Sequence, residues 1–102
     1  MKIKAEYILF EEEGKIVGVI PSLSLATDSN DKEDTIKGLK LMFSELVEFW
    51  KKRGLLLQDK IKEFCLAEDC PKERIKSFER ELQVSMYLLK VDKTFGTIYL
   101  EV

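Results

Sequence analysis

Alternating apolar and polar residues at the start of the chain predict a β-hairpin. Residues 2–10 fit a strand that presents one apolar face, formed by Ile3, Ala5, Tyr7 and Leu9. The opposite face begins polar and becomes apolar at Ile8 and Phe10. Three glutamates and Gly14 then make a turn, and Lys15–Ile20 fits a second strand that is apolar on both faces.

The pattern changes after Pro21, which lacks a backbone N–H and should stand at a strand end or edge. Residues 22–27 predict a short third strand with Leu23 and Leu25 facing the core. A polar turn at residues 28–31 leads into a long helix at about residues 32–53, which Gly54 ends.

The long helix carries a wide apolar arc, which spans roughly 160° at 100° per residue. Its members are Ile36, Leu39, Met42, Phe43, Leu46, Val47, Phe49 and Trp50. Leu41 stands alone among polar residues. Either the whole arc packs on the sheet, or its centre does and one flank is left for a partner.

The second half of the chain predicts a shorter helix through Leu57, Ile61 and Phe64, and Pro71 marks a boundary after it. A period of two over residues 78–88 favours a strand, and a helical start before Leu82 is the alternative for its first residues. A turn at 92–96 and a final strand at 97–102 follow. The predicted class is α+β: an antiparallel three-stranded sheet and a long helix, then a short helix and two C-terminal strands. Residues 1–102 form one domain, with a 1–53 unit and a 54–102 extension.

The outward face of the hairpin carries an apolar patch, because Ile8, Phe10, Val17 and Val19 lie opposite the face that receives the helix. Such a patch must be covered, either by the C-terminal elements of the same chain or by another subunit. These four residues, with Leu41 and Phe49, are the predicted protein interface. The remaining strand edges further predict a homodimer or higher homo-oligomer.

Composition argues against several kinds of chemistry. The 17 basic and 19 acidic residues give a net charge of −2, so no direct nucleic-acid binding is expected. There is no histidine, and Cys65 falls on the apolar stripe of the second helix, where it reads as a small core residue. Cys65 and Cys70 supply two of the four ligands of a structural zinc site. We therefore predict that the protein is not an enzyme and that it has no catalytic residue, metal or cofactor.

Four acidic residues near the start of the long helix suggest two alternatives: Asp28, Asp31, Glu33 and Asp34. An EF-hand loop counted from Asp28 needs glycine and glutamate where Glu33 and Leu39 stand, which excludes that calcium motif. Helix capping by Asp31 and favourable charge in the first helical turn explain the cluster without a ligand. A metal-dependent nuclease is the competing hypothesis.

The chain shows no signal-peptide core and no apolar run of transmembrane length, so no membrane association is expected. Its two cysteines are too close in sequence to form a disulfide framework. A reducing, cytoplasmic location is therefore expected.

Three motifs resemble those of a known family. Pro21-Ser22-Leu23 corresponds to a Pro-Asp-Leu-Pro-Gly-like strand end, Ser29-Asn30-Asp31 stands at a Gly-Asp-Thr-like turn, and residues 32–39 follow the pattern of a Leu-Glu-Glu-Ala-Leu helix start. In this order the motifs resemble the HicB-like antitoxins of bacterial toxin–antitoxin modules, over roughly residues 2–53. Ser22 stands where the family has aspartate.

The resemblance implies a partial ribonuclease-H-like fold without nuclease activity. It also implies a partner, a small basic HicA-like ribonuclease toxin whose catalytic surface the antitoxin would mask. Many family members bind operator DNA through a helix-turn-helix or ribbon-helix-helix module, and the second half of this chain has no recognisable module of either kind. The alternative is an orphan interaction or oligomerisation domain of the same fold.

Overall fold

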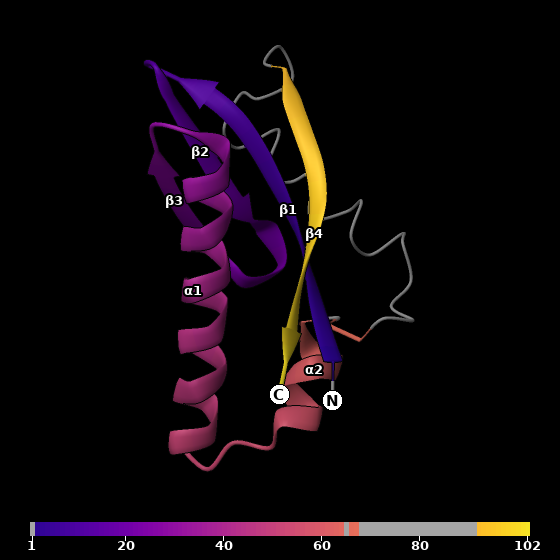
Figure 1. The fold of residues 1–102 in the computed structure, drawn as a ribbon. Coiled ribbons are helices and arrows are strands. Elements are labelled where there is room, and N and C mark those ends of the chain that lie inside the picture. Colours follow the sequence, from indigo (N-terminus) through magenta and orange to yellow (C-terminus); the bar gives the residue numbers. More distant parts are fainter. Residues whose placement is uncertain (1, 65, 68–91) are drawn as a thin grey trace.

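A four-stranded antiparallel sheet with one long helix on one face forms the centre of the protein (Figure 1). The computed structural model describes residues 2–64, 66–67 and 92–102. Its elements are β1 Lys2–Glu12, β2 Lys15–Ile20, the 3-10 turn η1 Pro21–Leu23, β3 Leu25–Ser29, α1 Lys32–Lys52, α2 Leu57–Glu63 and β4 Lys93–Glu101. The strand order is β3-β2-β1-β4. The α+β class is confirmed, and β4 extends the predicted three-stranded sheet to four strands.

The β1–β2 hairpin follows its predicted pattern. Glu12 pairs with Lys15, and the two residues between them, Glu13 and Gly14, have positive φ of 51° and 78°. Positive φ at both central positions is the requirement of a type I′ turn, whose twist suits a tight hairpin. The strand residues divide between the two faces as the alternation indicates, so the sheet has an apolar face under α1.

The third strand begins later than its sequence suggests. Pro21–Leu23 forms a 3-10 turn, which closes with the Ser24 N–H donating to the Pro21 carbonyl at 3.3 Å. The fixed φ of proline and its missing N–H favour the first position of a helical turn, and this preference overrides the apolar–polar alternation. The predicted strand at residues 22–27 is therefore wrong in its first half, and β3 begins only at Leu25.

The last strand begins earlier than predicted. Residues 93–96 of the expected turn belong to β4, where Lys93 pairs with Phe10 and Gly96 with Tyr7. A Cβ at Gly96 would overlap the ring of Tyr7, so this glycine makes room for a cross-strand aromatic ring. The strand predicted at residues 78–88 lies outside the described residues.

The main core lies between the sheet and α1. The helix contributes four buried apolar side chains: Leu39, Phe43, Val47 and Trp50. Its end matches the prediction, since Gly54 has φ of 72° and its N–H donates to the Lys51 carbonyl at 3.1 Å. Beyond this cap, α2 places the Phe64 ring parallel to Trp50, with 5.6 Å between the ring centroids.

Helix α1 comes very close to β2 at Gly18. A Cβ built on Gly18 would lie 2.6 Å from Cγ2 of Thr35 and 2.8 Å from Cδ1 of Leu39. Both distances are far below van der Waals contact, so a hydrogen at this position allows the helix to sit where it does. Toward the edge of the sheet, Gly38 faces Thr27 of β3, and a Cβ built on Gly38 would lie 3.2 Å from Cγ2 of Thr27.

A chain of hydroxyl groups fixes the same contact. Thr35 is fully buried in the first turns of α1, and its hydroxyl donates to the Ile16 carbonyl at 2.8 Å. The Ser29 hydroxyl lies 2.7 Å from the Thr35 hydroxyl. Buried hydroxyls need such partners, and here the partners join α1 to β2 and β3. The start of the helix is thus tied to the sheet by both packing and hydrogen bonds.

We expect Gly18→Ala to lower the free energy of unfolding by about 1–3 kcal/mol, because the added methyl group must displace both Thr35 and Leu39. Chemical denaturation followed by circular dichroism measures the loss. Gly38→Ala is the matched control, since its methyl group meets only the Thr27 side chain and gains helix propensity of up to about 1 kcal/mol. Equal losses in the two variants would contradict the close contact at Gly18.

Candidate functional site

The apolar patch predicted on the outer face of the hairpin is mostly buried. Ile8, Phe10 and Val19 are 1%, 4% and 4% exposed in the single chain, and they form a cluster separate from the main core. Val17 is partly buried and packs against them. The pattern therefore placed these four residues correctly on one face. Their role in an interface stays a prediction. On the same face of the sheet, β4 exposes Phe95, which lies opposite Ile8 and is 47% exposed, and Tyr99, which is 45% exposed.

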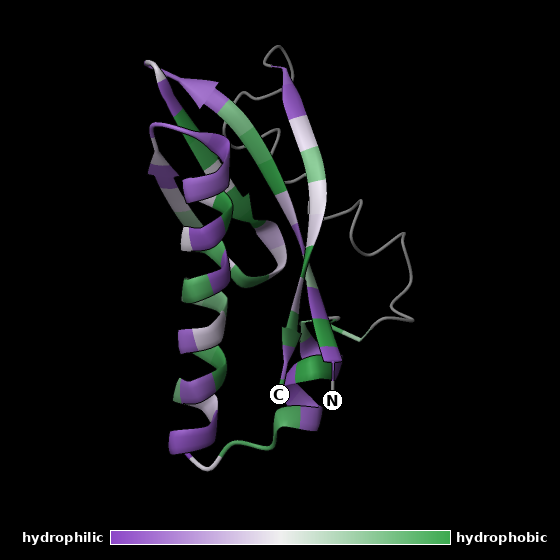
Figure 2. Ribbon diagram, viewed as in Figure 1, coloured by the Kyte–Doolittle hydropathy of each residue, from purple (hydrophilic) through white to green (hydrophobic). Residues whose placement is uncertain are grey.

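Two predicted interface residues on α1 are exposed, Leu41 at 60% and Phe49 at 49%. The connection between α1 and α2 adds Leu55 at 42% and Leu56 at 71%. We call Phe49, Leu55 and Leu56 the α1-end surface, since all three lie at or just beyond the end of this helix. Figure 2 shows the connection coloured as hydrophobic. Sequence reasoning missed Leu55 and Leu56, although three leucines in a row after a helix-ending glycine exceed what a tight connection can bury.

Carboxylates accompany these apolar side chains on α1. Glu45 and Glu48 are exposed and lie between Leu41 and Phe49 along the helix. Glu48 forms an ion pair with Lys51 at 3.7 Å, and the Arg53 guanidinium lies 5.2 Å from the centre of the Phe49 ring. An exposed pair of this kind contributes little to stability. The Glu45 and Glu48 carboxylates are therefore available to a partner at small cost to the fold.

The acidic cluster at the start of α1 acts as a helix cap in the structure. The Asp31 side chain accepts a hydrogen bond from the Asp34 backbone N–H at 2.8 Å, and Glu33 and Asp34 occupy the first turn. Asp28 is exposed on β3 and pairs with Val17. Among the described residues, no three side chains of the metal-ligating types come together. Cys65 and Cys70 lie outside those residues.

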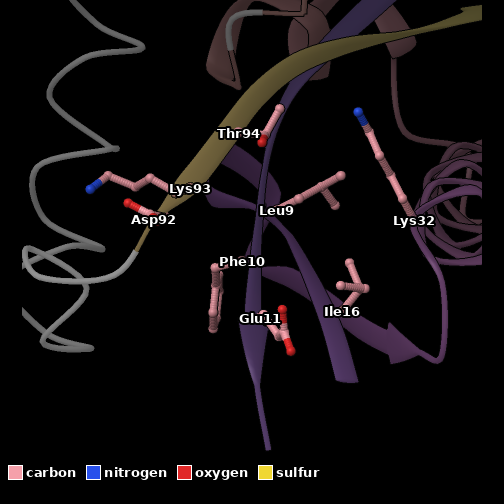
Figure 3. A pocket seen from close by; sticks show the side chains of 8 residues that line it. All are labelled: Leu9, Phe10, Glu11, Ile16, Lys32, Asp92, Lys93 and Thr94. Atoms are coloured by element: carbon pink, nitrogen blue, oxygen red, sulfur yellow. The ribbon is translucent and has the colours of Figure 1, made fainter. Parts of the chain in front are cut away.

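One shallow pocket, of about 190 Å³, opens near the hairpin turn. Figure 3 shows Leu9, Phe10, Glu11 and Ile16 from the hairpin, Lys32 from the start of α1, and Asp92, Lys93 and Thr94 around the start of β4. The pocket therefore offers a mixed apolar and charged lining.

Comparisons with protein-family models, with curated proteins and with solved structures gave no match to the chain. The HicB-like resemblance therefore rests on the three sequence motifs alone. Among the described residues, no helix combines the length and the apolar character needed to cross a lipid bilayer.

We expect Asp31→Ala to lower the free energy of unfolding by about 1 kcal/mol, because it removes the side chain that caps α1. Asp28→Ala is the control from the same cluster, and it should change stability little because Asp28 is exposed outside the helix. Thermal unfolding with and without Mg²⁺ completes the test. A rise in melting temperature with Mg²⁺ that both variants abolish would favour a metal site over a cap.

Proposed function

We propose that the protein is a non-enzymatic HicB-like antitoxin that binds a small basic ribonuclease toxin and masks its catalytic surface. The order of the elements supports this proposal, since a hairpin, a short third strand and one long helix follow each other as the resemblance implies. The motif residues also have distinct structural roles. Pro21–Leu23 forms the turn before β3, and Asp31 caps α1.

The exposed face of α1 carries the proposal. Leu41, Phe49 and the leucines after the helix remain accessible, although their burial would stabilise the chain if the fold could cover them. Between Leu41 and Phe49 stand Glu45 and Glu48, so apolar contact and negative charge occur on one surface. A basic partner with apolar side chains of its own complements that combination.

The two kinds of residue would act on different steps of binding. Large apolar side chains such as Phe49 and Leu56 anchor an interface once water is excluded, and therefore set the lifetime of the complex. The carboxylates act at longer range, and they raise the rate at which a positively charged partner arrives. Masking then needs no chemistry from this chain, because occupancy of the toxin's catalytic surface is enough to block it.

Co-expression with the small protein encoded next to this gene tests the proposal. We expect the neighbour to be toxic alone, harmless when this chain is present, and retained on this chain during purification. A neighbour that is neither toxic nor bound would overturn the proposal. Self-assembly of this chain without such a neighbour would instead favour the orphan interaction domain.

Charge reversal on α1 tests the surface itself. The double variant Glu45→Lys/Glu48→Lys should weaken the complex about tenfold or more, since it replaces attraction to a basic partner with repulsion. Association rates should fall most at low salt, where screening is least. Surface plasmon resonance at two salt concentrations measures both effects.

Glu11→Lys/Glu12→Lys is the matched control, since it makes the same charge change at the exposed end of the hairpin, away from the α1-end surface. Equal weakening by the two double variants would indicate a general charge effect and would contradict binding through α1. An unchanged melting temperature in both variants shows that the fold is intact.

A further inference from the structure

The outer edge of β3 has no partner strand within the described residues. β3 stands at the end of the sheet and pairs on one side with β2. The backbone N–H and C=O groups on its other side are thus available to another strand. From these features we infer that two copies of the chain join through β3, in antiparallel register about a two-fold axis, to form one continuous eight-stranded sheet.

The alternation of faces restricts how the two strands can pair. Leu25, Thr27 and Ser29 lie on the face under α1, while Ala26 and Asp28 are exposed on the opposite face. Residues directly opposite each other in a sheet share a face. A two-fold axis perpendicular to the sheet must then pass beside Ala26, Thr27 or Asp28, and it places both copies of α1 on the same side.

Length and charge select among the three registers. An axis beside Asp28 sets two aspartates directly opposite each other, which is unfavourable. An axis beside Ala26 pairs only three residues, because β3 begins at Leu25 and Ser24 before it has a left-handed φ of 53°. An axis beside Thr27 pairs all five residues of β3 and sets Ala26 opposite Asp28 of the second copy. It also sets threonine opposite threonine, which is a favourable cross-strand pair.

The position of α1 suits the same arrangement. The helix lies over both β2 and β3, since Thr35 and Leu39 face Gly18 while Gly38 faces Thr27. Neighbouring strands are about 4.8 Å apart. A helix axis centred between β2 and β3 therefore lies about 2.4 Å inside β3, and the two-fold axis lies about 2.4 Å outside β3. Two copies of α1 would then lie about 10 Å from each other, at the upper end of the usual separation of packed helices.

The helices are needed because two five-residue strands bury less than a stable dimer requires, which is about 1,200–2,000 Å². Gly38 packs on Thr27, the residue beside the proposed two-fold axis. Met42 follows one turn later and is only half-buried. The α1-end surface lies two or three turns farther along and stays accessible, so this dimer does not depend on the proposed toxin contact.

Sedimentation equilibrium of the full chain tests the arrangement through Ala26, whose exposed side chain can be changed with little effect on the fold. Wild type should dimerise reversibly. Ala26→Asp should raise the dissociation constant about tenfold, because it sets carboxylates opposite each other at two symmetric places. Ala26→Lys should lower the dissociation constant, because it sets an ammonium group opposite Asp28 of the second copy.

The double variant Ala26→Asp/Asp28→Lys should restore dimerisation, since it exchanges the signs and leaves each pair attractive. Glu12→Lys, at the exposed end of the hairpin, is the control and should leave the dissociation constant unchanged. β3 is short and carries the charge of Asp28, and both features can protect an edge strand from pairing. A wild-type chain that stays monomeric at millimolar concentration, or a dimer that ignores the charge of residue 26, would overturn the inference.

Discussion

The contact between α1 and β2 at Gly18 determines where the other surfaces of the protein lie. Because Gly18 has no side chain, Thr35 and Leu39 come down onto the strand, and the Thr35 hydroxyl reaches the Ile16 carbonyl. This close approach places the helix over the β2–β3 side of the sheet. The opposite side, where β1 meets β4, is closed at its lower end by α2 and by the bond from the Lys4 N–H to the Leu66 carbonyl at 2.9 Å (Figure 1).

The position of the helix also explains why part of its wide apolar arc remains uncovered. Leu39 and Trp50 at the centre of the arc, together with Val47 at one edge, face the sheet and are almost completely buried. Phe49 belongs to the same arc but lies on a flank, and half of its side chain surface is exposed. A sheet of four strands under a helix of 21 residues does not reach around both flanks. The uncovered flank belongs to the surface through which we propose that the chain binds its partner.

Local signals in the sequence were sufficient for much of the fold. Alternation gave both strands of the hairpin and the side on which Ile8 and Val19 lie, and a glycine with positive φ ends α1 as expected. Prediction failed where one residue type has two uses. Pro21 begins a helical turn and does not merely end a strand, and Gly96 accommodates the Tyr7 ring inside a strand. The use of Gly96 depends on Tyr7, a residue distant in sequence, which a local pattern does not contain.

The candidate surfaces were predictable to a smaller extent. Helical periodicity singled out Leu41 and the flank that holds Phe49, but it does not specify which flank the sheet covers. Leu55 and Leu56 lie in a connection where no periodicity applies. The edge of β3 became identifiable only with the strand order, because four strands can be arranged in several ways and each leaves different edges open.

The pairing of β1 with β4 has a consequence for how the chain acquires this fold. Lys2 lies opposite Glu101, so the central strand of the sheet is completed by residues 99 positions later in the sequence (101 − 2 = 99). Contacts between such distant residues slow folding, because a long loop must close before they form. During synthesis, β1, β2, β3 and α1 can therefore assemble while one edge of β1 still lacks its neighbour. For that interval the edge of β1 is open to other strands, and chaperones or a waiting binding partner would meet the chain in this state.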